Sequence, residues 1–408
     1  MKKKKKILYI TPSLQRAGAE KYVHDLITSL DKNIFDPQIL TVSDVDHNKI
    51  FPHVYYFSLK KKGFKIYKFL LPNYKIISKI LKYTLVNILL NEKFSNYLSK
   101  LLRIFILHSH RLRLKMLFKK FDYICVIDAL SFNLVKDSLR EFSNFDVHLM
   151  CHQIQFNNGV YRHFEKGKRY NFVYIDAQQL EEVKAEEILI GNNFLFPLSL
   201  KLSDYNIEDN LLSRISEVKG VEHHIGIFTR INNCKPIDIF LKAFQEIINK
   251  GESQVKLHIF GTTTQDPTYL AHLKEFISKN NLDQMVIFEG HSDDMINSIK
   301  EKNIDLVWGL SIYSFMGFSS LEIGAYGIPI ILNNIDISIN RADNDSKQCP
   351  PYFTNYVDLA AYTSTILNSN NKKIDLGELI KKKIAEEHDL DKNITNYQKY
   401  LLDVIDKN

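Results

Sequence analysis

Two cations lie close together in the second half of the chain. Arg230 directly follows an apolar run, residues 224–229, and Lys235 comes five positions later, where the next helix is expected to begin. An arginine can hold two oxygens of an anion at once, a lysine adds a point charge, and the N–H groups at a helix start add donors. The pair is a candidate site for a diphosphate, although a strand-end arginine beside a solvated lysine would give the same pattern.

The run SIYSFMGFSSLEIGAYGIP, residues 311–329, holds a second group of candidates. Gly317, Phe318 and Ser319 precede a helical segment, so their backbone amides are placed to bind a phosphate. Glu322 lies one turn into that helix, and a carboxylate there can accept both hydroxyls of a ribose. An acid in the first turn of a helix also complements the helix dipole, so a structural role for Glu322 is equally open.

These candidates need strands and helices that bring them to one edge of a sheet. Short apolar runs typical of buried strands recur along the chain, most of them separated by segments of helix length. The expected strands are 7–12, 38–42, 54–57, 123–127, 147–151, 172–175, 224–229, 255–260, 285–288, 304–310 and 329–332. Such alternation predicts parallel sheets, whose carboxyl ends are the usual place for ligands.

The pattern restarts after a polar stretch near residues 203–219, which indicates two domains. We expect an α/β fold with two Rossmann-like, doubly wound domains that face each other across a cleft. The first domain, residues 1–200, carries a basic helical insertion at 60–120. The second comprises residues 201–385, and residues 386–408 are expected to form a helix that packs back toward the N-terminal domain.

Composition and missing motifs exclude several classes of protein. With 45% hydrophobic and 25% charged residues, the chain can form globular cores and is neither collagen-like nor disordered. The four cysteines have no C-x-x-C spacing, which argues against a disulfide framework or a cysteine zinc site and fits a reducing cytoplasm. The apolar run after the first lysines is too short for a signal peptide, and no stretch approaches the roughly 18 apolar residues of a membrane span. The G-x-G-x-x-G, P-loop, G-x-S-x-G and H-E-x-x-H motifs are missing, which disfavours simple dehydrogenases, NTPases, serine hydrolases and zinc proteases.

Positive charge is concentrated between residues 60 and 120. This segment holds 16 Lys or Arg residues against one acid, Glu92, and therefore carries +15, so the rest of the chain carries −8 within a net charge of +7. Apolar residues recur there at helical spacing beside the lysines, which predicts basic amphipathic helices. Such helices either pack on the core with a solvated basic face or bind an anionic membrane surface. Nucleic acid is disfavoured because no zinc-finger spacing or RNP-like motif accompanies the charge.

The second half resembles the nucleotide-sugar domain of glycosyltransferase family 4, whose members have the GT-B fold. Arg230 and Lys235 match the family's R-then-K pair, and Gly261 ends the next strand as in the family. Residues 288–290, Phe-Glu-Gly, resemble its V-x-F-x-G segment. Residues 322–329 match its E-A-x-A-x-G-x-P ending, with isoleucine in place of the first alanine.

The opening of the chain is similar to the same family. The expected strand 7–12 is followed by residues 17–20, Ala-Gly-Ala-Glu, close to the family's G-G-A-E loop. The resemblance covers most of residues 223–334 and the first 30 residues.

The resemblance implies retaining transfer of a sugar from a nucleotide diphosphate to an acceptor hydroxyl, without a metal or other cofactor. Arg230 and Lys235 would neutralise the departing diphosphate, and Glu322 would hold the ribose. His152 follows the strand 147–151, where members often carry a histidine that faces the donor sugar, and it is a catalytic candidate that could equally be structural. The expected donor-binding residues are Gly18, Gly261, Gly290, Ser314, Gly317, Phe318 and Ser319.

One position departs from the family pattern. The first glutamate of the family's E-x7-E motif is replaced by Ser314, whereas the second is Glu322. A serine can hydrogen-bond a sugar hydroxyl but cannot act as a charged acceptor or base. The replacement is expected to change the choice of donor sugar or to reduce activity.

With the resemblance, these observations predict a retaining glycosyltransferase that uses a nucleotide-diphosphate sugar; uracil is expected as the base from its frequency in the family alone. The acceptor would be a lipid-linked or growing surface glycan of the lipopolysaccharide, capsule or exopolysaccharide type. The protein would work in the cytoplasm on the inner face of the cell membrane, held by segment 60–120, with no nucleic acid partner. Two alternatives stay open: a catalytically silent subunit or membrane scaffold that binds a nucleotide sugar, and a nucleotide-sugar epimerase of the same architecture.

Overall fold

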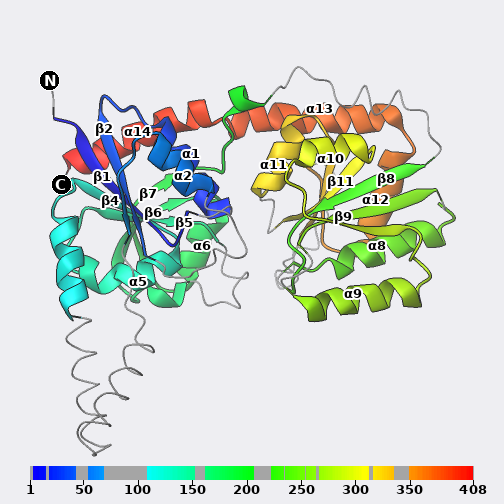
Figure 1. The fold of residues 1–408 in the computed structure, drawn as a ribbon, viewed down its shortest axis with the longest axis horizontal. Coiled ribbons are helices and arrows are strands. Elements are labelled where there is room, and N and C mark those ends of the chain that lie inside the picture. Colours follow the sequence, from blue (N-terminus) through cyan, green and yellow to red (C-terminus); the bar gives the residue numbers. More distant parts are fainter. Residues whose placement is uncertain are drawn as a thin grey trace, which may run out of the picture. The chain divides into compact units, whose positions relative to one another are not determined.

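The computed structural model describes eleven stretches of the chain. They are residues 3–14, 18–42, 54–68, 108–151, 161–205, 222–233, 235–252, 254–262, 266–311, 316–334 and 349–407. The chain forms two compact units, of which the first comprises residues 1–197 and 391–408 and the second residues 198–390 (Figure 1). The C-terminal helix thus belongs to the first unit, although the preceding helix belongs to the second.

The first unit is built on a seven-stranded parallel sheet with the strand order β3-β2-β1-β4-β5-β6-β7. Its strands are β1 (Lys5–Thr11), β2 (Phe35–Thr41), β3 (Ile66–Lys68), β4 (Tyr123–Ile127), β5 (Phe145–Leu149), β6 (Arg169–Tyr174) and β7 (Leu189–Leu195). Its helices are α1 (Gly18–Ser29), α2 (Val54–Lys61), a helix over residues 108–118, α5 (Ala129–Leu139), η3 (Tyr161–His163), α6 (Gln178–Ala185) and α14 (Leu390–Asp406).

Helices cover both faces of this sheet, which explains why its central strands are apolar throughout. In β1 and β4, alternate residues such as Leu8 and Ile124 pack with Phe132 of α5 in one core. The intervening residues face the other way, and Tyr9 of β1 contacts α14. Continuous apolar runs rather than alternating ones are therefore the sequence signature of these strands.

One predicted strand of the first unit is wrong. Residues 54–57 form the start of helix α2 rather than a strand. The aromatic and β-branched residues suggested a strand, but only Leu59 of this helix is buried, whereas Val54 and Phe57 are 44% and 66% exposed. The segment lies on α1, where the Ser58 hydroxyl is 2.9 Å from Nε2 of His24.

The second unit has a six-stranded parallel sheet with the order β10-β9-β8-β11-β12-β13. Its strands are β8 (His223–Phe228), β9 (Val255–Phe260), β10 (Val286–Gly290), β11 (Leu306–Ser311), β12 (Ile330–Asn334) and β13 (Tyr352–Phe353). Its helices are η4 (Leu202–Asp204), α8 (Asp238–Asn249), α9 (Pro267–Lys279), α10 (Met295–Glu301), α11 (Phe318–Ala325), α12 (Tyr356–Leu367) and α13 (Asn370–Glu387).

The core of the second unit is centred on Trp308 of β11. Phe240 of α8 stacks on the indole at 5.5 Å between ring centroids, and the indole N–H donates a hydrogen bond to Thr363 of α12. On α11, a side chain at Gly324 would lie 2.7 Å from Ile380 and Ile384 of α13, so this glycine permits the close approach of two helices. The helix that contains Glu322 is therefore fixed tightly to the body of the unit.

Candidate functional site

The loop that follows β8 carries the two cations. Arg230 is exposed and Lys235 is half-buried. The N–H of Ile237 donates to the hydroxyl oxygen of Tyr269 on α9 at 2.7 Å, and that hydroxyl lies 3.2 Å from the carbonyl oxygen of Lys235. Burial raises the pKa of Tyr269, and the charge of Asp238 adds to this, so the phenol keeps its proton and remains a donor. Tyr269 thus holds the loop in place, a role for which the sequence offered no signal.

The segment that follows β11 leads into α11, with Gly317 as the residue before the helix. A side chain built at Gly317 would meet no atom of the described residues within 4 Å, so the start of this helix is open. The first N–H groups of an α-helix have no acceptor within the helix and carry partial positive charge. Phe318 and Ser319, the first two helical residues, are half-buried at this end.

Strand order brings these two segments together. β8 and β11 are neighbours in the middle of the sheet. From β8 the chain adds β9 and β10 toward one edge of the sheet, and from β11 it adds β12 and β13 toward the other edge. The carboxyl ends of such a central pair form the topological switch point, where ligands bind in open α/β sheets. Arg230 and Gly317 follow these two carboxyl ends, so the structure places both predicted groups at the switch point of the second unit.

Glu322, in the second turn of α11, is half-buried and has a partner that sequence reasoning missed. The hydroxyl of Tyr205 donates a hydrogen bond to Oε1 of Glu322 at 3.3 Å. Tyr205 follows η4, 117 residues before Glu322, so no local pattern could have revealed this contact.

The two predicted glycines of the adjacent strands have a shared structural role. The N–H of Gly261 donates to the carbonyl oxygen of Gly290 at 2.7 Å. A Cβ at Gly261 would lie 2.0 Å from the carbonyl oxygen of Thr229, which directly precedes Arg230. Gly290 has φ of +81°, a conformation that favours glycine. The two glycines therefore allow the backbone at the ends of β8, β9 and β10 to pack closely, next to the loop that carries Arg230. The contact of Gly261 and Gly290 with a donor stays a prediction.

In the first unit, Gly18 is exposed at the start of α1. Two residues away, the buried Glu20 accepts a hydrogen bond from Ser13 at 2.5 Å, which ties α1 to the segment after β1. His152 and Ser314 lie outside the described residues, as does most of segment 60–120, so their predicted roles stay predictions.

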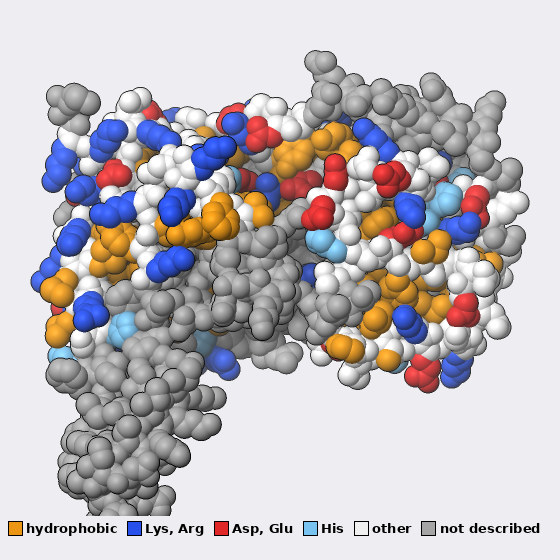
Figure 2. All heavy atoms as spheres, viewed as in Figure 1, with side chains coloured by type: hydrophobic (Ala, Val, Ile, Leu, Met, Phe, Trp, Pro, Cys, Tyr) orange, Lys and Arg blue, Asp and Glu red, His pale blue; other side chains and the backbone are white. Residues whose placement is uncertain are grey.

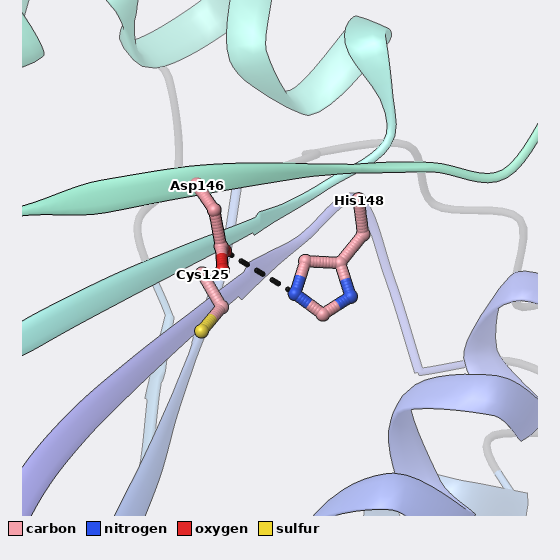
Figure 3. A group of neighbouring side chains, drawn as sticks. All are labelled: Cys125, Asp146 and His148. Atoms are coloured by element: carbon pink, nitrogen blue, oxygen red, sulfur yellow. Dashed lines mark ion pairs between the residues drawn. The ribbon is translucent and has the colours of Figure 1, made fainter. Parts of the chain in front are cut away.

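Beneath α14, the first unit holds a buried polar cluster that the sequence did not predict: Cys125, Asp146 and His148, with the tyrosines around them. Figure 3 shows Cys125 of β4 beside Asp146 and His148 of β5, whose paired atoms Oδ1 and Nε2 are 3.3 Å apart. All three side chains are fully buried, and their ligand-type atoms lie within 4.8 Å of one another.

Two tyrosine hydroxyls contact members of this cluster. The hydroxyl of Tyr22 on α1 is 2.8 Å from Nδ1 of His148. The hydroxyl of Tyr397 on α14 is 3.3 Å from Nε2 of the same ring and 3.6 Å from Sγ of Cys125, so it contacts two of the three groups. We therefore interpret the cluster as a hydrogen-bonded core that joins α1 and α14 to the sheet.

Comparisons with known proteins give a family match and a fold. Residues 212–383 match the model of a family described as glycosyl transferases group 1. No curated protein matches the chain. The solved structure of HepE from Anabaena in complex with UDP and glucose is similar over 98% of this chain and 100% of its own, with a TM-score of 0.67 and 13% identity.

Two further solved structures show the same likeness. Sucrose-phosphate synthase from Thermosynechococcus elongatus is similar over 99% of this chain and 100% of its own, with a TM-score of 0.66 and 14% identity. The lipopolysaccharide outer core galactosyltransferase WaaB is similar over 96% of this chain and 98% of its own, with a TM-score of 0.63 and 12% identity. These likenesses confirm the predicted fold class: the chain has two Rossmann-like parallel-sheet domains and the GT-B fold.

Proposed function

We propose that this chain is a glycosyltransferase that moves a sugar from a UDP-linked donor to an acceptor hydroxyl with retention of the anomeric configuration. One observation carries the proposal: Arg230 and the amino end of α11 lie at the switch point of a sheet within the very residues, 212–383, that match the glycosyl transferases group 1 model.

In the proposed mechanism, the second unit binds the nucleotide and stabilises the leaving group. Negative charge develops on the diphosphate as the bond to the sugar breaks, and Arg230 and Lys235 lower the energy of that charge. The N–H groups at the start of α11 bind the phosphate oxygens. Glu322 accepts the ribose hydroxyls. Because these charges do the work that a divalent ion does in other transferases, we expect transfer without a metal.

Two neighbours support the choice of donor and acceptor. HepE was solved with UDP and glucose, and a second structure of it holds UDP-glucose, which favours a uridine nucleotide here. WaaB is a lipopolysaccharide galactosyltransferase, which favours a surface glycan or its lipid-linked precursor as acceptor. We place the reaction at the inner face of the cell membrane because of the basic segment 60–120, which would bind anionic lipid.

Part of that basic segment is described by the structure. The helix over 108–118 exposes Leu112 and Met116, at 47% and 61%, one turn apart among cations such as Arg113 and Lys119. Across the described residues, every helix is too short or too polar to cross a bilayer. An amphipathic, basic helix of this kind supports binding parallel to a membrane surface.

Nucleotide binding is the first test of the proposed function. Thermal unfolding of the full chain is measured with UDP, GDP or ADP, each with magnesium or with EDTA, for the wild type, Arg230→Ala and Lys274→Ala. Lys274 is an exposed cation on α9 and serves as the matched control. A ligand at 100 times its Kd stabilises the folded state by about 2.7 kcal/mol, which raises the Tm of a domain of this size by about 2–4 °C.

We expect UDP to raise the Tm equally with magnesium or EDTA in the wild type and in Lys274→Ala, and to have little effect on Arg230→Ala. The absence of a shift with any nucleotide would contradict the proposal and favour a catalytically silent scaffold. If the protein converts a UDP-sugar into its epimer in the absence of an acceptor, as detected by NMR, it is an epimerase instead.

A further inference from the structure

Tyr205 is fixed to the second unit through backbone hydrogen bonds of its own residue and of the segment before it. Its N–H donates to the carbonyl oxygen of Leu202 within η4 at 3.1 Å. Just before η4, the backbone of Leu200 is bridged to the segment after α13, donating to the carbonyl oxygen of His388 at 2.8 Å and accepting from the N–H of Leu390 at 2.9 Å. The tyrosine is therefore presented from an anchored segment.

The side chain of Tyr205 lies along one face of α11. Glu322 and Tyr326 are four residues apart and therefore share a face of the helix end. The Tyr205 hydroxyl contacts Glu322 at 3.3 Å, while its ring packs edge-on against the ring of Tyr326 at 6.0 Å between centroids and an interplanar angle of 71°. Two contacts on neighbouring turns fix both the position and the direction of the phenol.

We propose that Tyr205 is a positioning residue that orients the Glu322 carboxylate for the ribose of the donor; this inference rests on the proposed function. A glutamate side chain has three rotatable bonds, and a free carboxylate would sample many directions. The hydrogen bond from Tyr205 fixes Oε1. A carboxylate has about four lone-pair positions, so Glu322 can accept from Tyr205 and still accept from ribose hydroxyls.

This role gives Tyr205 a signature that a purely structural residue would not have. If Tyr205 acts through Glu322 on the ribose, its hydroxyl should matter most for nucleotides whose ribose has both hydroxyls. A tyrosine that only stabilises the fold would affect all nucleotides alike. The comparison of UDP with 2′-deoxy-UDP therefore separates the two cases.

The experiment measures the Kd of UDP and of 2′-deoxy-UDP by isothermal titration calorimetry for the full chain as wild type, Tyr205→Phe and Tyr356→Phe. Tyr356 is a partly exposed tyrosine at the start of α12 and controls for loss of a phenol hydroxyl in the same unit. For Tyr205→Phe we expect UDP to bind about threefold to tenfold more weakly, the range for one net hydrogen bond, and 2′-deoxy-UDP less than twofold more weakly. For Tyr356→Phe both Kd values should match the wild type.

A second pair of variants tests whether Tyr205 acts through Glu322. In the background of Glu322→Gln, adding Tyr205→Phe should change the Kd of UDP by less than twofold, because coupled residues are not additive. Full additivity would overturn the positioning role.

The outcomes distinguish this inference from the proposed function. If the wild type binds no UDP, the proposed function fails. If the wild type binds UDP and prefers it over 2′-deoxy-UDP, but Tyr205→Phe leaves that preference unchanged or weakens both nucleotides equally, the inference is overturned while the proposed function stands. Equal wild-type affinity for the two nucleotides would also overturn it, because the ribose would then not be read.

Discussion

Asp305 links the two strands whose far ends carry the candidate site, and it also forms a buried ion pair. Asp305, just before β11, accepts a hydrogen bond from the N–H of His224 in β8 at 2.9 Å and donates its own N–H to the His224 carbonyl oxygen. Its other carboxylate oxygen is 2.8 Å from Nζ of Lys373 on α13, and both side chains are about nine-tenths buried. The contact between Asp305 and His224 fixes the spacing of β8 and β11 at the ends of these strands that lie opposite to Arg230.

The pair makes the stability of the second unit depend on pH. Burial alone would raise the pKa of Asp305, but the neighbouring imidazole of His223 and the hydrogen-bonded ammonium of Lys373 outweigh it and hold the pKa below its ordinary value. The folded state therefore binds this proton less readily than the unfolded state. The stabilisation is complete above the unfolded pKa of about 4 and is lost as the pH falls through the lower, folded value.

We expect Lys373→Met to lower the free energy of unfolding by about 3–5 kcal/mol at neutral pH, because it leaves a buried carboxylate without its cation. The difference from the wild type should shrink as the pH is lowered toward about 3. Urea unfolding followed by the fluorescence of Trp308, the one tryptophan of the chain, reports on this unit.

Lys372→Met, at the exposed neighbouring position, is the matched control and should unfold like the wild type. A deficit for Lys373→Met that stayed constant between neutral pH and pH 3 would show that the lysine contributes by packing rather than by charge.

At the scale of elements, α14 is held to the first unit by hydroxyl groups as well as by apolar packing. Tyr397 is fully buried, and its hydroxyl is 3.4 Å from that of Tyr9 and lies beside Cys125 and His148. Removing a hydroxyl from such a site leaves its buried partners without a hydrogen bond, which costs about 1–3 kcal/mol. The helix should then separate from the sheet more often.

We expect Tyr397→Phe to increase the rate at which a thiol reagent labels Cys125 by about tenfold or more, because this buried cysteine is reached only when α14 opens. Peptide mass spectrometry separates Cys125 from the other three cysteines. Asn396→Ala, on the exposed side of the same helix, should label at the wild-type rate. A rate for Tyr397→Phe that matched Asn396→Ala would mean that the cluster does not hold the helix.

The elements differ in how far the sequence could predict them. Strands buried on both faces, such as β1 and β8, produce apolar runs that are read directly from the chain, and they were predicted to within a few residues. The helix α2 was predicted as a strand because its aromatic residues satisfy strand propensity, while its exposure depends on packing against α1. Edge strands β3 and β7 have few buried residues and were missed.

The residues of the candidate site also differ in how far the sequence predicts them. Arg230 and Lys235 were predicted because they lie between a strand and the next helix, and Glu322 because it lies about one turn into a helix; these are local patterns. Tyr205 and Tyr269 were not found, because each contacts its partner across a long stretch of sequence through a fold that the pattern does not specify. Local signals predicted the groups that bear charge, whereas the groups that hold them in place required the structure.

Across the whole molecule, charge is distributed unequally between the units. Lys and Arg side chains gather on the face of the first unit that Figure 2 shows, whereas acidic and basic side chains are mixed on the second unit. On the helix over 108–118, Arg111 pairs with Asp137 of α5 and Lys115 pairs with Glu141, which follows α5, so these two cations fasten the helix to the unit. Arg113 and Lys119 are exposed, as is Leu112.

This distribution predicts electrostatic binding to membranes. Each Lys or Arg near an anionic surface contributes about 1 kcal/mol, and screening shortens the field to about 4 Å near 0.5 M salt. We therefore expect the protein to sediment with vesicles that contain phosphatidylglycerol, to be released toward 0.5 M salt, and to bind pure phosphatidylcholine vesicles weakly.

The variant with both Arg113→Glu and Lys119→Glu should bind about tenfold more weakly or worse, since it reverses two of these charges. The matched control reverses two exposed lysines of α9, Lys274→Glu with Lys279→Glu, and should bind like the wild type because the same net charge is changed on the second unit. Equal weakening by the two double variants would assign binding to net charge alone, and equal binding to neutral vesicles would exclude the electrostatic mechanism.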